Sequence, residues 1–527
     1  MVDSAINRME RFQQALNAYP EQIPFDRLAK LLDFSSITEC EKWILDLDLQ
    51  HLQINPELNI IENTSTLRYE IEILVTKKSN TADLIKYQQV RLLAEEARVL
   101  RQLEQMIGNP IPHYRIVGEF STGFSANKGK VTQLSISTDS LKLFPECIAN
   151  LQHLKKLNLN NTGISSLNEK ITQIKYLEEL RMSFNKMKEI PSQISSFEIL
   201  KVLDLNSNDL KKIDGKIGSL TSLKQLYLQK NKFKSLPKDI LLLKDLEHLV
   251  ISFNNIKSLP KSFEKLKKLK GLDLSNNEFE NKDIKFFLPE NLEYLSIEQC
   301  QISELPEVLS QQVKLKTINF NANNLVSLPG WIDNWENLEY LYAKENLIEE
   351  LPESFVFPNL KMIYLDYNRI VSLPKNFEKN TSLIAIELNH NLLEELPSSL
   401  KPLTNLETLG LIENKINTIP DWIGDFKALK YLHLEGNDLR NLPDSFINLK
   451  SLEALYLKRN RLITVPESIN GLQALQLLDL SENGLKNLPN WIATLPSLRY
   501  LDISDNLIEE KPEWLTALDE DGVTIIS

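Results

Sequence analysis

The sequence predicts an α/β solenoid: a curved horseshoe of stacked turns with parallel strands on its concave face, after a small, mostly helical N-terminal domain. Leucines recur with a constant period over residues 131–520. An asparagine and a proline recur at fixed places within each period. Residues 1–130 lack this period and show helical patterns instead. Because each repeat buries its apolar face only against its neighbours, a chain of 527 residues needs no single large core.

The leucine period is clearest in residues 429–451, where leucines stand at 429, 432, 434, 439, 442 and 449. Seventeen such turns are present, all 23 residues long except the tenth, 338–359, which has 22. We give positions within a turn as offsets from its first residue. The motif L-x-x-L-x-L-x-x-N at this period is the signature of a leucine-rich-repeat solenoid. The first residues of the turns are 131, 154, 177, 200, 223, 246, 269, 292, 315, 338, 360, 383, 406, 429, 452, 475 and 498.

Asparagine at offset eight and proline at offset fourteen each occur in fourteen of the seventeen turns. A buried asparagine amide can satisfy backbone groups of its own turn and of the adjoining turn. Proline holds the preceding leucine extended and starts a short helix on the convex side. We therefore expect structural roles, and no catalytic role, for both positions. The exceptions are Asp139, Thr162 and Cys300 at offset eight, and Asn168, Asp214 and Asp283 at offset fourteen.

The residues before the array are expected to form two regions. Residues 1–65 resemble a winged helix-turn-helix, but five basic and eleven acidic side chains make DNA a poor partner for it. In residues 66–130 we expect a strand at 67–75, a long helix at 81–107 that Gly108 ends, and a cap or linker. The GFSANKGKV stretch has the wrong spacing for a phosphate loop and is followed by a strand pattern. Residues 521–527 are read as a C-terminal tail.

Composition indicates the compartment and excludes some classes of partner. The chain has 72 acidic against 60 basic residues, which disfavours nucleic acid. Its three cysteines, Cys40, Cys147 and Cys300, cannot form the disulfide-bonded caps usual in extracellular arrays of this kind. The start of the sequence has no apolar signal region, and no apolar run is long enough to span a membrane. We expect a soluble, cytoplasmic protein without a cofactor.

The repeats can also be compared with known classes. Turns with L-P after the asparagine, such as NDLRNLPDSF and NLIEELPESF, resemble the intracellular class that includes Ras-suppressor, Scribble and the plant Ras-group leucine-rich-repeat proteins. The resemblance covers residues 131–520. It implies a non-enzymatic signalling scaffold, often associated with small GTPases. The class has no invariant functional residue to carry over.

The concave face offers the one informative bias in composition. Offsets two, four, six and seven point outward from the strands and hold nine of the fourteen tyrosines, seven of them in turns 10–17. The same turns present nine acids there against Lys344, Lys458 and Arg459. The acids are Glu345, Asp366, Glu387, Glu413, Glu435, Asp479, Glu482, Asp502 and Asp505.

Tyrosine beside carboxylates suits a protein partner with a basic or arginine-rich surface, through burial, hydrogen bonds and cation–π contacts. Adjacent turns should bring the tyrosines at 340, 342, 364 and 367 into one aromatic patch. A small GTPase is a partner by family resemblance. The residues that we expect to bind protein are Tyr340, Tyr342, Tyr364, Asp366, Tyr367, Glu387, His390, Glu413, Tyr431, His433, Glu435 and Tyr456.

Two other functions are weaker hypotheses. A nucleic-acid-linked regulator would use the N-terminal head, and a metal-dependent enzyme would use the neighbourhood of His390 and Glu413, but no metal motif accompanies either residue. Residues 224–285 hold fourteen basic and eight acidic side chains, which we interpret as a solvated flank. Trp331, Trp422, Trp491 and Trp514 share offset sixteen and are expected to cover repeat junctions or to form a second contact stripe.

Overall fold

The computed structural model describes residues 84–118, 121–139, 141–190, 192–212, 215–279 and 288–527. It divides into two compact units, Met1–Asn185 and Lys186–Ser527, and each is treated by itself. The winged-helix-like head and the strand at 67–75 lie outside the described residues.

The first unit combines a helix, two hairpins and the first repeats. In chain order its elements are β1 (Leu84–Tyr87), β2 (Val90–Leu93), α5 (Ala94–Ile107), β3 (Gly123–Asn127), β4 (Lys130–Ser135), the 3-10 helix η3 (Glu146–Asn150), β5 (Lys156–Asn158), the 3-10 helix η4 (Glu169–Gln173) and β6 (Glu179–Arg181). Strands β4, β5 and β6 are parallel neighbours, with leucines at offset three paired across the sheet.

The prediction of one long helix at 81–107 is wrong for its first half. Residues 84–93 form the antiparallel hairpin β1–β2, and α5 begins only at Ala94. Leucines in LIKYQQVRLL fit a helical spacing, but the hairpin buries Tyr87 and Leu92 completely or nearly so, and this tertiary burial overrides the local pattern. The expected end of the helix is confirmed, since Gly108 adopts the left-handed conformation (φ 72°) that stops it.

The GFSANKGKV stretch forms an antiparallel hairpin of β3 and β4. Its turn residues Lys128 and Gly129 have φ of 50° and 81°, as a tight hairpin turn requires. β3 thus pairs with the first strand of the repeats, which would otherwise present an open edge. Glu96 of α5 reinforces this junction, because its buried carboxylate accepts a 3.0 Å hydrogen bond from the Val131 amide.

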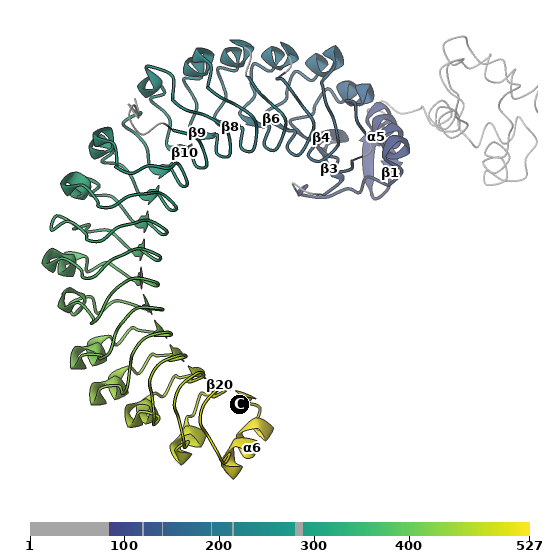
Figure 1. Ribbon diagram of the computed structural model, residues 1–527. Coiled ribbons are helices and arrows are strands. Elements are labelled where there is room, and N and C mark those ends of the chain that lie inside the picture. Colours follow the sequence, from purple (N-terminus) through teal and green to yellow (C-terminus); the bar gives the residue numbers. More distant parts are fainter. Residues whose placement is uncertain (1–83, 119–120, 140, 191, 213–214, 280–287) are drawn as a thin grey trace, which may run out of the picture. The chain divides into compact units, whose positions relative to one another are not determined.

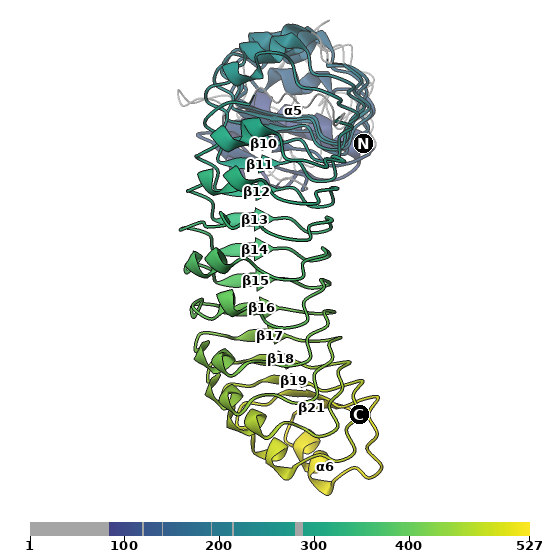
Figure 2. The ribbon, with the colours of Figure 1, turned by 60° about the vertical axis from the view of Figure 1, so that its left-hand side comes forward.

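The second unit is a curved stack in which short parallel strands lie on the inner side and short helices on the outer side (Figure 1). Each strand from β7 to β20 covers offsets two to four and pairs in register with the next strand, as Leu409 with Leu432. Figure 2 shows strands β10 to β19 stacked one after another. The strands are β7 (Val202–Asp204), β8 (Gln225–Tyr227), β9 (His248–Val250), β10 (Gly271–Asp273), β11 (Tyr294–Ser296), β12 (Thr317–Asn319), β13 (Tyr340–Tyr342), β14 (Met362–Tyr364), β15 (Ala385–Glu387), β16 (Thr408–Gly410), β17 (Tyr431–His433), β18 (Ala454–Tyr456), β19 (Leu477–Asp479), β20 (Tyr500–Asp502) and β21 (Thr524–Ile526).

The convex helices are mostly single 3-10 turns, and proline precedes most of them, as expected. Each buries one apolar residue between the turns, such as Ile423 or Phe446, so the core runs as a narrow layer along the stack. The helices are η5 (Ser192–Ser196), η6 (Gly215–Ser219), η7 (Lys238–Leu242), η8 (Phe263–Lys265), η9 (Glu307–Gln311), η10 (Gly330–Asn334), η11 (Lys375–Lys379), η12 (Ser398–Leu400), η13 (Asp421–Asp425), η14 (Asp444–Asn448), η15 (Glu467–Gly471), η16 (Asn490–Thr494) and α6 (Glu513–Glu520).

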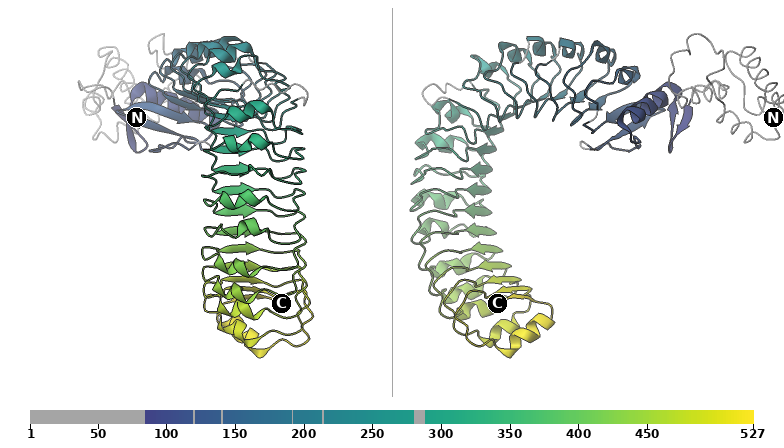
Figure 3. Two further views of the ribbon diagram at one scale, coloured as in Figure 1. Left: turned by 90° about the vertical axis from the view of Figure 1, so that its left-hand side faces the viewer. Right: turned by 45° about the vertical axis from the view of Figure 1, so that its right-hand side comes forward.

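The C-terminal residues do not form a loose tail. Helix α6 lies at the C-terminal end of the stack (Figure 3) and packs on η16. Its Leu515 and Leu518 side chains are buried. The chain then returns as β21, which pairs in parallel with β20. Residues 524–526 therefore extend the sheet by one strand.

The asparagines at offset eight form a continuous hydrogen-bonded ladder. Asn414 is typical: its Nδ2 donates to the carbonyls of Leu388, Leu411 and Ile412 at 3.0 to 3.3 Å. Its Oδ1 accepts from the Leu393 amide at 3.0 Å. One amide thus satisfies backbone groups of two turns, as the sequence predicts. At the exceptional Cys300, the thiol contacts the Leu274 carbonyl at 3.4 Å in place of the amide.

The residue just before each ladder position adopts a left-handed backbone. Offset seven has a φ between 49° and 64° in every turn of the second unit that begins at residue 200 or later. Gly436 is the one glycine in this row, so most turns accept the cost of about 1–2 kcal/mol that a side chain adds in this conformation. This bend projects the offset-seven side chain away from the core, beside the concave face.

We predict that Asn414→Ala loosens the array locally. The change leaves the Leu388 carbonyl and the Leu393 amide without their partner, which should lower the local free energy of opening by about 1–3 kcal/mol. Hydrogen exchange in turns 12 to 14 measures this loss. Asn417→Ala is the matched control, because Asn417 is exposed in the same turn. Equal protection in the two variants would contradict the ladder's role.

A second prediction concerns Glu96. Burial raises the pKa of its carboxyl from 4.5 to about 7 in the folded chain. Since the folded value lies above the unfolded one, its stabilising contribution is present below the unfolded pKa and is lost as pH rises through the folded pKa. Amide protection of β4 should therefore fall between about pH 5 and about pH 8. The Glu96→Gln variant keeps an oxygen acceptor but cannot ionise, so this part of the pH dependence should vanish. The same pH dependence in Glu96→Gln would show that another group than Glu96 causes it.

Candidate functional site

Offset four forms a row of outward side chains along the concave face, which we call the central row. The register places each member beside the next, because the strand residues Tyr342, Tyr364 and Glu387 pair in sequence across β13, β14 and β15. Parallel strands are about 4.8 Å apart, so neighbouring side chains in the row are within contact distance. The central row of turns 10–17 is Tyr342, Tyr364, Glu387, Gly410, His433, Tyr456, Asp479 and Asp502.

Two aromatic pairs stack within this row. The rings of Tyr342 and Tyr364 lie 4.9 Å apart and within 4° of parallel. The rings of His433 and Tyr456 lie 4.5 Å apart and within 8° of parallel. Partial burial raises the pKa of the Tyr364 and Tyr456 hydroxyls, so both remain neutral hydrogen-bond donors near neutral pH. The row therefore offers two flat aromatic platforms.

Glu387 and Gly410 lie between the two platforms. A Cβ atom at position 410 would come 1.7 Å from the Glu387 Oε2 atom, so the glycine provides the space in which this carboxylate lies. Burial raises the Glu387 pKa above its ordinary value, and the nearby Asp366 adds to this, while a 2.9 Å hydrogen bond from Asn389 opposes it. The carboxylate is thus partly desolvated, and no lysine or arginine in the described chain pairs with it.

The expectation that the Asp366 side chain is exposed on the concave face is wrong. Asp366 is 2% exposed, and its carboxylate lies 2.9 Å from the Lys344 ammonium and accepts a 2.6 Å hydrogen bond from the Asn389 side chain. Asp366 precedes the left-handed bend at Tyr367, and its side chain lies against Lys344 of the preceding turn and Asn389 of the next turn instead of pointing to solvent. Lys344 also lies 4.6 Å from the centre of the Tyr364 ring, so this ion pair packs against the Tyr342–Tyr364 stack.

The single aromatic patch expected from the four tyrosines is divided in the structure. Tyr367 is 53% exposed and stacks on the His390 ring at 4.1 Å, in the offset-seven row. Tyr340 is half-buried at offset two, where its strand partner is Met362. Tyr431, also at offset two, is exposed and donates a 3.4 Å hydrogen bond to Glu453. The left-handed turn separates offset seven from the central row, which a register argument alone does not reveal.

The metal-site hypothesis finds no support in the side-chain arrangement. Glu413 pairs with Arg459 at 2.6 Å, and Glu435 lies 3.4 Å from the His433 ring. His390 is stacked on Tyr367 instead of facing a carboxylate. Among the described residues, no group of three or more histidine, cysteine or acidic side chains could hold a metal ion.

The charge of the concave face remains strongly negative after internal pairing. Lys344, Lys458 and Arg459 each bind one of its acids, with Glu482 lying 3.0 Å from Lys458. Asp479 accepts hydrogen bonds from Ser481, and Asp502 accepts them from Ser504. Within the described chain, six acids of this face have no lysine or arginine partner: Glu345, Glu387, Glu435, Asp479, Asp502 and Asp505.

The four convex tryptophans are all half-buried, as covers of repeat junctions should be. Trp331 contacts Trp335 edge-on at 5.8 Å, and Trp422 contacts Phe426 at 5.6 Å. Trp491 donates a 2.8 Å hydrogen bond to Glu467 of the preceding turn. Of these contacts only that of Trp491 joins two turns, and the two roles expected for the stripe stay predictions.

Sequence reasoning missed Lys344, Asn389 and Gly410 as parts of this site. Gly410 carried a usable signal, because glycine at an outward strand position leaves space beside its neighbours. The roles of Lys344 and Asn389 depend on the buried position of the Asp366 side chain, for which the repeat pattern gives no signal.

Comparisons with known proteins agree with this architecture. A model described as "Leucine-rich repeat region" matches residues 192–286, and one described as "Leucine rich repeat" matches 358–416, 392–439, 417–462 and 464–508. A search of curated protein sequences found no match. The specific Ras-suppressor and Scribble class is not distinguished by these models.

Solved structures show the same fold. A leucine-rich-repeat protein of Leptospira interrogans is 28% identical, with a TM-score of 0.63, over 79% of this chain and 100% of that one. YopM from Yersinia enterocolitica is 26% identical, with a TM-score of 0.55, over 72% and 79%. Drosophila Toll, solved in complex with Spatzle, is 23% identical, with a TM-score of 0.52, over 69% and 49%, and supports the fold alone. No described helix is long and apolar enough to cross a membrane.

We predict that Asp366 contributes to stability. Asp366→Ala removes the acceptor for Asn389 and the partner of Lys344, and should cost about 1–3 kcal/mol in local opening free energy. Glu413→Ala removes an exposed ion pair and should change stability by less than about 1 kcal/mol. Hydrogen exchange in turns 10 to 13 compares the two variants. Equal amide protection in the Asp366→Ala and Glu413→Ala variants would contradict the stabilising role of Asp366.

Proposed function

We propose that the chain is a non-enzymatic, cytoplasmic protein-binding scaffold whose concave face in turns 10–17 binds a basic, arginine-rich segment of a partner protein. The observation that carries this proposal is the partly desolvated Glu387 carboxylate between two aromatic platforms. A carboxylate in this position lacks the cation that would compensate its burial. An incoming arginine supplies that cation.

Arginine fits this site better than lysine does. Its planar guanidinium can stack on the ring of Tyr364 or His433 while its N–H groups donate to Glu387. The lysine ammonium is a more strongly hydrated point charge and has no flat face for the rings. The six unpaired acids extend the attraction along the sheet and would increase the rate of association at low salt.

The proposal also includes a cytoplasmic location and a small GTPase as partner. Cys147 and Cys300 are free thiols, which agrees with a reducing compartment. The resemblance of the repeats to the Ras-suppressor class makes small GTPases the first partners to screen. An acidic face disfavours nucleic acid as the ligand of this surface.

An oligo-arginine peptide provides a direct test. We expect the chain to bind it in isothermal titration calorimetry at low salt, and to bind an oligo-lysine peptide of equal length more weakly. The double variant Tyr342→Ala/Tyr364→Ala should lose at least about tenfold in affinity, because aromatic centres of interfaces often contribute about 2 kcal/mol or more. Glu387→Gln should remove most of the preference for arginine.

The controls separate binding from folding and from general attraction. Tyr176→Ala removes an exposed tyrosine of the first unit and should leave the affinity unchanged. Hydrogen exchange of turns 10 to 15 should be the same in all variants. Undiminished affinity in the double tyrosine variant, or equal binding of both peptides by the wild-type chain, would refute the proposed site.

A further inference from the structure

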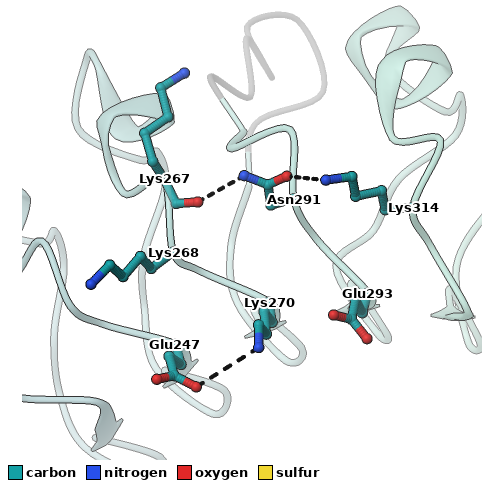
Figure 4. Close-up of a pocket in the computed structure, with 7 residues that line it drawn as sticks. All are labelled: Glu247, Lys267, Lys268, Lys270, Asn291, Glu293 and Lys314. Atoms are coloured by element: carbon teal, nitrogen blue, oxygen red, sulfur yellow. Dashed lines mark hydrogen bonds and ion pairs between the residues drawn. The ribbon is translucent and has the colours of Figure 1, made fainter.

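A second charged surface lies on the flank of the solenoid, in the loops that lead into β9 to β12. It forms an open cleft of about 300 Å³. The cleft is separate from the central row, since its residues occupy offsets 21, 22 and 1, outside the strands. Figure 4 shows the residues that line it: Glu247, Lys267, Lys268, Lys270, Asn291, Glu293 and Lys314.

The carboxylates of the cleft are already neutralised from outside it. Glu247 binds Lys224 at 2.9 Å, and Glu293 binds Lys316 at 2.8 Å. These lysines lower the pKa of both carboxyls, so both acids stay ionised and paired. The two acids of the cleft therefore cancel only part of the charge of the lysines that line it.

Two of the four lining lysines have no carboxylate partner in the described chain. Lys268 binds Asp245 at 2.6 Å, and Lys270 lies 4.0 Å from Glu247. Lys314 instead donates to the neutral Asn291 side chain at 2.6 Å, and no described acid pairs with Lys267. The cleft thus keeps uncompensated positive charge in a protein of net charge −12.

Asn291 links the backbone of Lys267 to the side chain of Lys314, while the Lys267 side chain points away from both (Figure 4). Its Nδ2 donates to the Lys267 backbone carbonyl at 2.8 Å, which turns its Oδ1 toward Lys314 (Figure 4). An ammonium has three N–H donors, so Lys314 has two left for a ligand after this bond.

The repeat itself does not require lysine at this position. The equivalent residue varies between turns. In some it is a neutral side chain that donates to a carbonyl of the preceding turn, as Asn337, Asn405 and Ser451 do at 2.7 to 3.0 Å. In others it makes no such bond, as at Ile199 and Ala428. Lysine at this position in the two turns that flank Asn291 therefore adds positive charge to the cleft that the packing of the repeat does not need.

We propose that this cleft binds a compact anion with two or more phosphate groups. Lys270 and Lys314 would donate to the phosphate oxygens, and Asn291 would position Lys314. The Lys267 side chain would turn toward the ligand from the direction it takes in Figure 4 and add a third cation. Single phosphates fill the volume poorly and match only part of the charge. The phosphate groups can belong to a soluble compound or to a phosphorylated lipid headgroup, and both present the same chemistry to the cleft.

The first arm of the test uses tripolyphosphate with the full chain in isothermal titration calorimetry at moderate salt. We expect saturable binding that sulfate does not reproduce. Lys267→Gln/Lys314→Gln should weaken it by about tenfold or more, because two charge-assisted contacts are lost. Lys261→Gln/Lys265→Gln removes the same charge from exposed lysines of the same turn outside the cleft, and should change the affinity by less than about twofold.

The second arm uses sedimentation with phosphatidylcholine vesicles that contain phosphatidylinositol bisphosphate. Retention that tripolyphosphate competes away assigns a lipid headgroup, and tripolyphosphate binding without retention assigns a soluble ligand. Absence of binding in both arms, or equal losses in the two double variants, overturns the proposal. The peptide test of the concave face is unaffected by either result, because the cleft variants leave the central row intact.

Discussion

The asparagine amide at offset eight is the interaction on which the rest of the structure depends. A turn of 23 residues must bend sharply after its strand, and the bend leaves backbone groups that no strand or helix can satisfy. Asn414 and its equivalents satisfy these groups in two consecutive turns at once. The ladder therefore fixes each turn against the next, and the stack gains its register from side chains as well as from the sheet.

Both candidate sites follow from that register. Identical spacing brings offset four of successive turns into one row, so residues 23 apart in sequence, such as His433 and Tyr456, become stacked neighbours. The same spacing gathers Lys267, Asn291 and Lys314 on the flank. A solenoid of this kind builds a binding surface by choosing one residue per turn, because outward positions are free of packing constraints.

The two surfaces differ in sign and in place, although one scaffold carries both. The concave face retains unpaired acids after its three cations are used, and Glu387 is held partly desolvated among them. The flank retains unpaired lysines after its acids are used. In both places the charge left over after internal pairing, and not the local composition, decides which partner fits. The two proposed ligands would therefore contact different residues of the chain.

The sequence by itself determined the solenoid, the turn boundaries, the strands and the asparagine ladder, since a constant period forces one local solution in every turn. It also placed tyrosines and acids on the concave face. Only the tertiary structure decided that Asp366 is buried with Lys344, that Tyr367 stacks on His390 away from Tyr342, and that residues 84–93 form a hairpin. The periodicity specifies on which face of the sheet a side chain lies. It does not specify the left-handed bend at offset seven or the pairing of charges across turns, because both depend on contacts between residues of different turns.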